Sequence, residues 1–244
     1  MKAIILAAGY ATRLYPLTEN QPKPLLEVNN ISILNHILDK VHKIEGITDI
    51  YVVTNARFYD AFRTWHCNYP LADKITLIND GTTSNDDRLG AVGDIHYVVQ
   101  DKDINDDLLV IAGDNLFGFE LQHFINFSDK HNTSSVAFCD LKNVEKVRRK
   151  LGVGVLDGEK VIGFEEKPLE PSSALASTAC YLFKKNDLPF IEQAMERGSA
   201  DNSGDFVKFL VNNSQVHGFV FDEHWFDIGS FESLEEANTL YKNM

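Results

Sequence analysis

The chain begins with a short apolar run that passes directly into a loop of small residues and then reaches a cation. Leu6 ends the run, Ala7, Ala8 and Gly9 follow it, and Arg13 comes shortly afterwards. Small residues let a ligand approach the backbone closely, and successive N–H groups in such a loop form a concavity that holds an anion. Arg13 could add bidentate hydrogen bonds to phosphate oxygens. The same order also fits a plain turn with a solvated arginine, and it matches neither the dinucleotide nor the P-loop pattern.

Lys23 is the second cation of this region, and it lies between Pro22 and Pro24. Two prolines restrict the backbone on both sides of the lysine, which lowers the entropy cost of fixing its position. We therefore favour a phosphate-binding role for Lys23. A proline-rich turn with a solvated lysine is the alternative.

Two aspartates occupy positions where a strand ends or a turn begins. Asp114 follows the apolar run 108–112 and Gly113, and Asp227 precedes a glycine turn at Gly229. Mg²⁺ binds one or two carboxylates and takes its other oxygens from phosphate and water. Together the two aspartates could form a magnesium site. Each alone also fits a turn or a helix cap.

Glu166 and Lys167 form an adjacent acid and base at the end of a predicted strand in the second half. This pair would suit a ligand with both hydroxyls and a phosphate, because the carboxylate accepts from hydroxyls and the ammonium pairs with phosphate. The alternative is a solvated ion pair, which contributes little to stability.

The elements that must position these residues alternate along the first half. Strand-like runs separated by helical periodicity predict right-handed crossovers and a mainly parallel sheet with helices on both faces. Predicted strands are 2–6, 50–54, 75–78 and 108–112, and predicted helices start near Ser32 or Asn30 and cover 59–66 and 89–99. Ligands bind beyond the carboxyl ends of such strands, which is where Gly9, Asn79 and Asp114 lie.

The second half has shorter strands and closer turns, including a hairpin at Asp157-Gly158. Strands are predicted at 135–139, 152–156, 161–164, 178–183 and 216–221, and helices at 188–197, 206–212 and 230–241. No linker or repeat interrupts the chain. We therefore predict a single α/β domain, 1–244, with a Rossmann-like, mainly parallel (mixed) sheet flanked by helices.

Composition excludes some function classes. The net charge of -13, from 23 basic and 36 acidic residues, argues against nucleic-acid binding. The three cysteines are far apart, which fits a reducing compartment and provides no metal framework. No targeting segment or membrane span is visible, so we expect a cytoplasmic protein without a membrane partner.

Five motifs occur in order along nearly the whole chain, and with them the chain resembles the sugar-1-phosphate nucleotidyltransferases, most of all the glucose-1-phosphate thymidylyltransferases. The resemblance implies a nucleotidyltransferase (GT-A-like) fold, with a nucleotide-binding half, 1–118, and a sugar-phosphate-binding half, 119–244. The motifs are LAAGxxTRL at 6–14, PKPLL at 22–26, GDNLF at 113–117, EEKP at 165–168 and WxDxG at 225–229.

The resemblance also implies roles for individual residues. Arg13, Lys23 and Asp114 would be catalytic, and Asp114 and Asp227 would bind Mg²⁺ as the cofactor. The nucleotide would be bound by Leu6, Ala7, Ala8, Gly9, Arg13, Lys23, Asn79, Leu89 and Gly90, with Asn79 facing the base edge. The sugar phosphate would be bound by Gly152, Glu166, Lys167, Ser177, Thr178 and Lys208.

The implied reaction joins a nucleoside triphosphate, with dTTP or UTP favoured, to a sugar 1-phosphate, with glucose 1-phosphate favoured. The sugar-phosphate oxygen would attack the α-phosphorus in line and release pyrophosphate. Members of this family form dimers or tetramers, so the resemblance also implies a homo-oligomer.

The chain departs from the family pattern at three places. Ala11 stands where relatives often have a second glycine. The segment 82–88 is longer and more acidic than usual, and because Asp86 and Asp87 would repel phosphate, we expect them to face the base, the sugar hydroxyls or Arg88. No long C-terminal repeat region is present, so no attached acyltransferase is expected.

Three alternatives remain open. One is CTP-dependent transfer to a non-sugar phosphomonoester such as phosphocholine, for which Trp225, Tyr181 and Phe183 could supply an aromatic cage. The second is a Mn²⁺-dependent glycosyltransferase, which would lack the Arg13 and Lys23 loop. The third is a non-catalytic nucleotide-sugar sensor.

Overall fold

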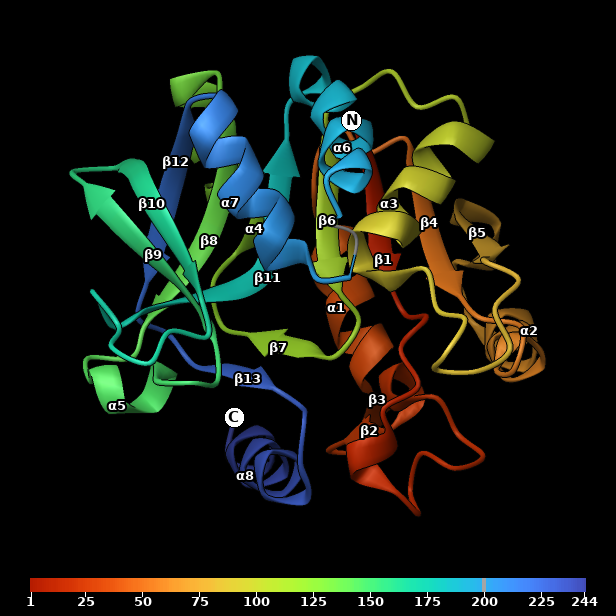
Figure 1. Ribbon diagram of the computed structural model, residues 1–244. Coiled ribbons are helices and arrows are strands. Elements are labelled where there is room, and N and C mark those ends of the chain that lie inside the picture. Colours follow the sequence, from red (N-terminus) through yellow and green to blue (C-terminus); the bar gives the residue numbers. More distant parts are fainter. Residues whose placement is uncertain (199–200) are drawn as a thin grey trace.

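The fold is built on a nine-stranded mixed sheet, as seen in a computed structural model that describes residues 1–198 and 201–244. The strand order is β5-β4-β1-β6-β11-β8-β12-β10-β9 (Figure 1). The sheet contains β1 (Lys2–Leu6), β4 (Asp49–Thr54), β5 (Ile75–Asn79), β6 (Leu108–Ala112), β8 (Ser134–Asp140), β9 (Gly152–Asp157), β10 (Lys160–Glu166), β11 (Leu175–Phe183) and β12 (Val216–Phe221).

The first half of the sheet is parallel and the second half is mixed. Strands β5, β4, β1 and β6 run in the same direction, whereas β11 is antiparallel to both β6 and β8. Strand β12 returns parallel to β8, and β10 is antiparallel to β12 and β9. The predicted Rossmann-like α/β class with a mainly parallel, mixed sheet is therefore confirmed.

Helices cover both faces because alternate strand residues are apolar on both sides. In β1, Ala3 and Ile5 pack into one core with α1, α2, α4 and α8, while Ile4 packs into another with α3, α6 and α7. The helices are α1 (Ile33–Val41), α2 (Tyr59–Asn68), α3 (Gly90–Asp101), α4 (Leu121–His131), α5 (Val144–Val147), α6 (Pro189–Glu196), α7 (Ser203–Asn213) and α8 (Phe231–Lys242).

Local signals in the sequence set several of these boundaries. Ser32, not Asn30, caps α1, and its hydroxyl accepts from the N–H of Asn35 at 3.2 Å. The β9–β10 hairpin turns at Asp157-Gly158, as predicted, where Gly158 adopts a φ of 58°. Among the described residues no helix has the length and apolarity needed to cross a membrane.

A small antiparallel pair that the sequence analysis did not predict joins the two halves. Strands β7 (Asn115–Phe117) and β13 (Trp225–Asp227) lie with α8 beyond the carboxyl ends of β1 and β6 (Figure 1). The register pairs Asn115 with Asp227, and the N–H of Ile228 donates to the carbonyl of Asp114 at 3.0 Å. Two aspartates that are distant in the sequence thus meet at the end of the sheet. A second small pair is β2 (Glu27–Val28) with β3 (Ile31–Ser32).

Candidate active site

Two adjacent pockets open where the strands end. The first, here called the charged pocket, has a volume of about 500 Å³, and the second, here called the acidic pocket, about 330 Å³. The charged pocket is lined by Ala11, Thr12, Arg13, Leu14, Lys23, Asn85, Arg88, Asp114, Asp201, Asp227 and Gly229. The acidic pocket is lined by Leu6, Ala8, Gly9, Tyr10, Asp80, Asn85, Arg88, Gly90, Ala91, Asp94, Ala112, Asp114, Asp201 and Ser203.

The end of β1 and the loop after it line the acidic pocket. Leu6, Ala8, Gly9 and Tyr10 contribute to the lining, whereas Ala7 is buried in the core and its N–H donates to the carbonyl of Val53 at 2.8 Å. A Cβ at Gly9 would meet no protein atom within 4 Å. The protein itself therefore does not require a glycine here, and the space lies on the pocket side, where a ligand would fill it.

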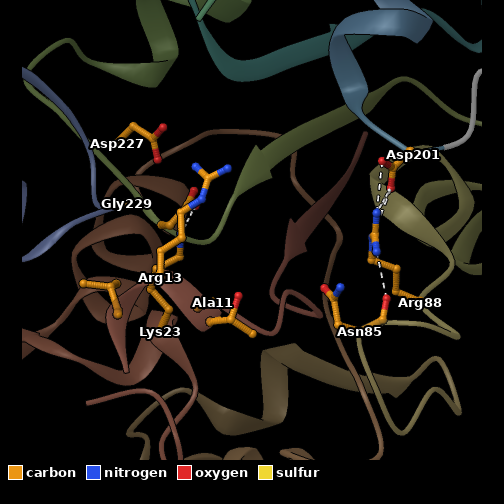
Figure 2. Close-up of a pocket in the computed structure, with 11 residues that line it drawn as sticks. Ala11, Arg13, Lys23, Asn85, Arg88, Asp201, Asp227 and Gly229 are labelled. Carbon is orange, nitrogen blue, oxygen red and sulfur yellow. Dashed lines mark hydrogen bonds and ion pairs between the residues drawn. The ribbon is translucent and has the colours of Figure 1, made fainter. Parts of the chain in front are cut away.

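Lys23 and Arg13 both face the charged pocket. A 3-10 helix, Lys23–Leu25, follows Pro22 and fixes the start of the lysine side chain, whose Nζ lies 2.5 Å from Oδ2 of Asp114. Burial alone would lower the pKa of Lys23, but the charge of Asp114 and the hydrogen bond to it outweigh this effect and raise the pKa. Arg13 forms no ion pair within the described part of the chain (Figure 2).

Asp227 faces Arg13 across the same pocket (Figure 2). Desolvation by the surrounding protein and the negative charge of Asp114 raise the pKa of Asp227 to about 6. The negative charge of Asp114 beside Asp227 makes this end of the pocket a favourable setting for a cation. The charges of Lys23, Arg13 and Lys167 partly offset this repulsion.

The carboxylate pair fits the donor set of Mg²⁺. Asp114 accepts from Nδ2 of Asn115 at 2.9 Å, and Oδ1 of Asn115 accepts from the indole N–H of Trp225 at 2.6 Å, so the aspartate is held in position. Among residues 1–198 and 201–244 no cluster of three or more His, Cys, Asp or Glu side chains could hold a metal. A cation here would thus take two protein carboxylates and complete its shell with phosphate and water oxygens.

The acidic pocket contains two carboxylates that the sequence analysis did not select. Asp80 follows β5, and Asp94 lies one turn inside α3; both line the pocket. Asn79, the predicted base reader, lines neither pocket, and its Oδ1 accepts from the N–H of Gly81 at 2.9 Å. Gly90 lines the acidic pocket at the start of α3, whereas Leu89 is exposed outside both pockets.

The acidic segment 82–88 is organised around Asp87, which accepts from the N–H groups of Thr83 and Ser84 at 3.0 and 2.7 Å. These two backbone hydrogen bonds lower the pKa of Asp87 to about 2. The expectation that Asp87 faces Arg88 was therefore wrong, because its carboxylate closes its own loop, whereas a contact of Asp86 or Asp87 with the base or the sugar hydroxyls stays a prediction.

Arg88 pairs with Asp201 instead of Asp87. Its Nε and Nη2 each donate to this carboxylate at 3.1 Å. The pair lies across the charged pocket from Arg13 and Lys23 (Figure 2). It links the loop before α3 to the segment before α7, so the two halves of the chain meet over the pockets.

Glu166 and Lys167 sit at the end of β10, with Lys167 Nζ 3.4 Å from Oε1 of Glu166. Burial raises the pKa of Glu166, and the adjacent lysine opposes this shift. Two glycines make room for the carboxylate: a Cβ at Gly152 would lie 3.1 Å, and one at Gly204 only 2.2 Å, from Oε2 of Glu166. The position of the Glu166 carboxylate thus depends on the absence of a side chain at positions 152 and 204.

All six predicted sugar-phosphate residues, Gly152, Glu166, Lys167, Ser177, Thr178 and Lys208, lie outside both pockets. Thr178 is fully buried and its hydroxyl donates to the carbonyl of Ala137 at 2.9 Å. Ser177 lies near Tyr181 on β11, and Lys208 is exposed on α7. The structure therefore brings together Arg13, Lys23, Asp114 and Asp227, but it brings none of the six predicted sugar-phosphate residues to the two pockets.

The aromatic residues of the phosphocholine alternative are not assembled into a cage. Tyr181 and Phe183 are buried in the core that contains α3, α6 and α7. Trp225 packs against the core on the other face of the sheet. The arrangement gives no observation in favour of a quaternary ammonium site.

Comparison with known sequences identifies relatives of the whole chain. A family model described as nucleotidyl transferase matches residues 2–244. The bifunctional protein GlmU of Methanocaldococcus jannaschii is 34% identical, over 98% of this chain and 53% of that protein. The glucose-1-phosphate adenylyltransferase of Fervidobacterium nodosum is 24% identical, over 96% of this chain and 60% of that protein. The chain thus spans a little over half the length of the curated relatives it matches.

Comparison with solved structures gives the same fold. A candidate glucose-1-phosphate thymidylyltransferase from Bacillus anthracis, in complex with sucrose, has a TM-score of 0.80 and 26% identity, and the match covers 100% of this chain and 96% of that one. A UDP-glucose pyrophosphorylase complexed with UDP-glucose has a TM-score of 0.83 at 19% identity, with 99% and 98% covered. At 19% identity, the likeness to the pyrophosphorylase concerns the fold alone.

Proposed function

The chain belongs to the nucleotidyl transferase family, and we propose that it transfers a nucleoside monophosphate from a nucleoside triphosphate to a sugar 1-phosphate. The observation that carries the proposal is the charged pocket, where Arg13 has no acidic partner within the described residues and Lys23 lies beside it. A guanidinium without a carboxylate partner, at the end of a parallel sheet and in a chain of net charge -13, is a site for an anion.

The reaction joins two polyanions, so the main work of the protein is neutralisation and alignment. A phosphate oxygen of the sugar phosphate attacks the α-phosphorus, the new P–O bond forms, and the bond to the bridging oxygen of the pyrophosphate breaks. Arg13 and Lys23 stabilise the charge of the departing pyrophosphate. No general base is needed, because a phosphate monoester is already ionised near neutral pH.

Asp114 and Asp227 are the residues that would hold Mg²⁺, which supplies positive charge to the phosphate oxygens when bound. Lys167 offsets charge on the sugar phosphate, and Glu166 accepts hydrogen bonds from sugar hydroxyls. Lys23 is shared in this scheme: its ammonium neutralises Asp114 before the nucleotide binds and phosphate oxygens afterwards.

The resemblance to thymidylyltransferases favours dTTP or UTP with glucose 1-phosphate as the substrate pair. The relatives include an adenylyltransferase, so membership of the family does not fix the base. The identity of the base depends on the side chains of the acidic pocket.

The test is pyrophosphate release with Mg²⁺, on a grid of ATP, CTP, GTP, UTP and dTTP against a panel of sugar 1-phosphates with phosphocholine added. Release that requires one triphosphate and one sugar phosphate together is the expected result. Release only with phosphocholine, or none in any combination while triphosphates still bind, would contradict the proposal.

A further inference from the structure

One carboxylate in the acidic pocket has no partner for one of its oxygens. Asp94 is 6% exposed, and its Oδ1 forms no hydrogen bond with any residue in 1–198 or 201–244. A buried acceptor without a donor is costly, and in native structures such a group calls for an explanation. Asp94 also lines the acidic pocket, so a ligand bound there lies against its carboxyl group.

The second carboxylate in the pocket, Asp80, limits what Asp94 can offer a ligand. Burial raises the pKa of Asp94 to about 8, and the charge of Asp80 and a hydrogen bond to Asp80 act in the same direction. The two carboxyl groups can thus share one proton at neutral pH, and the oxygens that do not carry it are acceptors.

Asp80 itself is fixed by the loop that it begins. The N–H of Thr82 donates to Asp80 Oδ1 at 2.7 Å, and the hydroxyl of Thr82, which lies 3.0 Å from the Tyr10 hydroxyl, contacts the same carboxylate. The orientation of Asp80 is thus held from the backbone. The carboxylate oxygens of Asp80 therefore occupy fixed positions in the acidic pocket.

Acceptors of this kind distinguish the nucleic acid bases. Cytosine, adenine and guanine carry an exocyclic amino group, whose N–H can donate to a carboxylate oxygen. Uracil and thymine have a single ring N–H on that edge, between two carbonyl oxygens, and those oxygens would approach Asp80 and Asp94 without a proton between them. A site with two carboxyl groups therefore favours a base whose amino group offers two N–H donors over a base whose single N–H lies between carbonyl oxygens.

This inference rests on the nucleotidyl transfer proposed above, and it names the nucleotide class for the same site. We infer that Asp94 and Asp80 select a nucleoside triphosphate whose base carries an exocyclic amino group, cytosine, adenine or guanine, over UTP and dTTP. The resemblance alone favours the opposite choice, so the two predictions can be separated by experiment.

The experiment measures the binding of all five triphosphates by titration calorimetry without a sugar phosphate, for the wild type and three variants. Asp94→Leu removes the acceptor and places an apolar side chain beside Val92 and Ile95 on the same helix. Asp94→Asn keeps an oxygen toward the pocket and can donate its amide N–H to Asp80. Asp101→Leu, at the exposed end of α3, is the matched control.

We expect at least one amino-bearing triphosphate to bind the wild type about tenfold more tightly than UTP and dTTP, as the gain of one hydrogen bond predicts. Asp94→Leu should abolish this preference, while Asp94→Asn and Asp101→Leu should keep it. Wild-type binding that favours UTP or dTTP, or a preference that survives in Asp94→Leu, would overturn the inference. Thermal unfolding of each variant verifies the fold.

Turnover on the same triphosphates separates this inference from the proposed function. Transfer that is fastest with UTP or dTTP would leave nucleotidyl transfer standing and overturn the base selection. Tight, Asp94-dependent binding of an amino-bearing triphosphate without transfer to any sugar phosphate would support the base selection and overturn nucleotidyl transfer.

Discussion

The ammonium of Lys23 lies 2.5 Å from Oδ2 of Asp114, and this contact joins the proline-flanked loop to the end of β6. Gly113, directly before Asp114, allows the approach, since a Cβ there would lie 2.7 Å from the carbonyl of Leu6. In the proposed function, the phosphate-binding cation and the metal-binding carboxylate thus form an ion pair with each other before the substrates bind.

Replacing Lys23 tests this relationship. We expect Lys23→Ala to lower kcat/KM by about 100-fold or more, as loss of one preorganised charge at a transition state typically does. The measurement is steady-state pyrophosphate release with the best substrate pair. Lys43→Ala, on an exposed position without an ion pair in the described chain, is the control. A Lys23→Ala enzyme with normal kcat and KM would show that the contact is only structural.

Asp227→Asn should change activity and stability in opposite directions. The pKa of Asp227 is raised to about 6 by desolvation and by the charge of Asp114, so removal of its charge should stabilise the metal-free protein at pH 7.5, by at most about 1 kcal/mol because the side chain is exposed to solvent. The same change removes a proposed Mg²⁺ ligand, and the Mg²⁺ concentration for half-maximal activity should rise about tenfold or more.

Thermal unfolding and a Mg²⁺ titration of activity check the two effects. Asp222→Asn, an exposed carboxylate in the preceding loop, should change neither. If Asp227→Asn kept the wild-type Mg²⁺ dependence, its place in the metal site would be lost, whatever the change in stability.

Much of the fold could be predicted because long apolar runs and helical periodicity report directly on the sheet and its helices. The β7–β13 pair could not, because three-residue strands carry no periodic signal and their pairing depends on distant residues. Helix α4 was missed although Leu121, Phe124, Ile125 and Ser128 have helical spacing and are buried. That signal was present in the sequence.

Four of the five motifs predict residues that meet in the structure, since Arg13, Lys23, Asp114 and Asp227 line one pocket. The fifth motif, EEKP at 165–168, contributes to neither pocket. Asp94 was not predicted as a site residue, because the sequence marks it only as a single acid among the apolar residues on the buried face of α3. The backbone conformation of Ala11 could not be predicted from its residue type. Ala11 adopts a φ of 47° and a ψ of 39°, and this left-handed conformation explains why relatives often have glycine there.

Gly204→Ala should weaken sugar-phosphate binding through Glu166. The new Cβ would lie 2.2 Å from Oε2 of Glu166, so the carboxylate must move away. We expect KM for the sugar phosphate to rise about tenfold, the cost of one hydrogen bond to a charged group, with KM for the triphosphate nearly unchanged. Gly163→Ala is the control on β10, because its Cβ would meet Val155 at an ordinary 3.6 Å. Equal KM values for both variants would contradict the role of Glu166.

The last prediction concerns pH and His217, which is 8% exposed on β12. Its ring stacks on His131 at 4.0 Å between centroids, and its Nδ1 lies 2.7 Å from the hydroxyl of Thr133. Burial, with the neighbouring His131, lowers the pKa of His217 below its ordinary 6.5. The folded state thus prefers the neutral ring. The contribution of the neutral His217 ring to stability is therefore complete above pH 6.5. It is lost as the pH falls from 6.5 through the lowered pKa, because the unfolded chain binds the proton more readily than the folded one.

We therefore expect the free energy of unfolding to fall between pH 7.5 and 5.5, with up to about 1.4 kcal/mol of the loss due to His217, the limit for one proton over one pH unit. His217→Gln should show a smaller loss over the same interval, even if it is less stable at both pH values. His123→Gln, at an exposed position on α4, should keep the wild-type loss. Chemical denaturation at the two pH values measures these differences, and identical losses in His217→Gln and the wild type would assign the pH dependence to other groups.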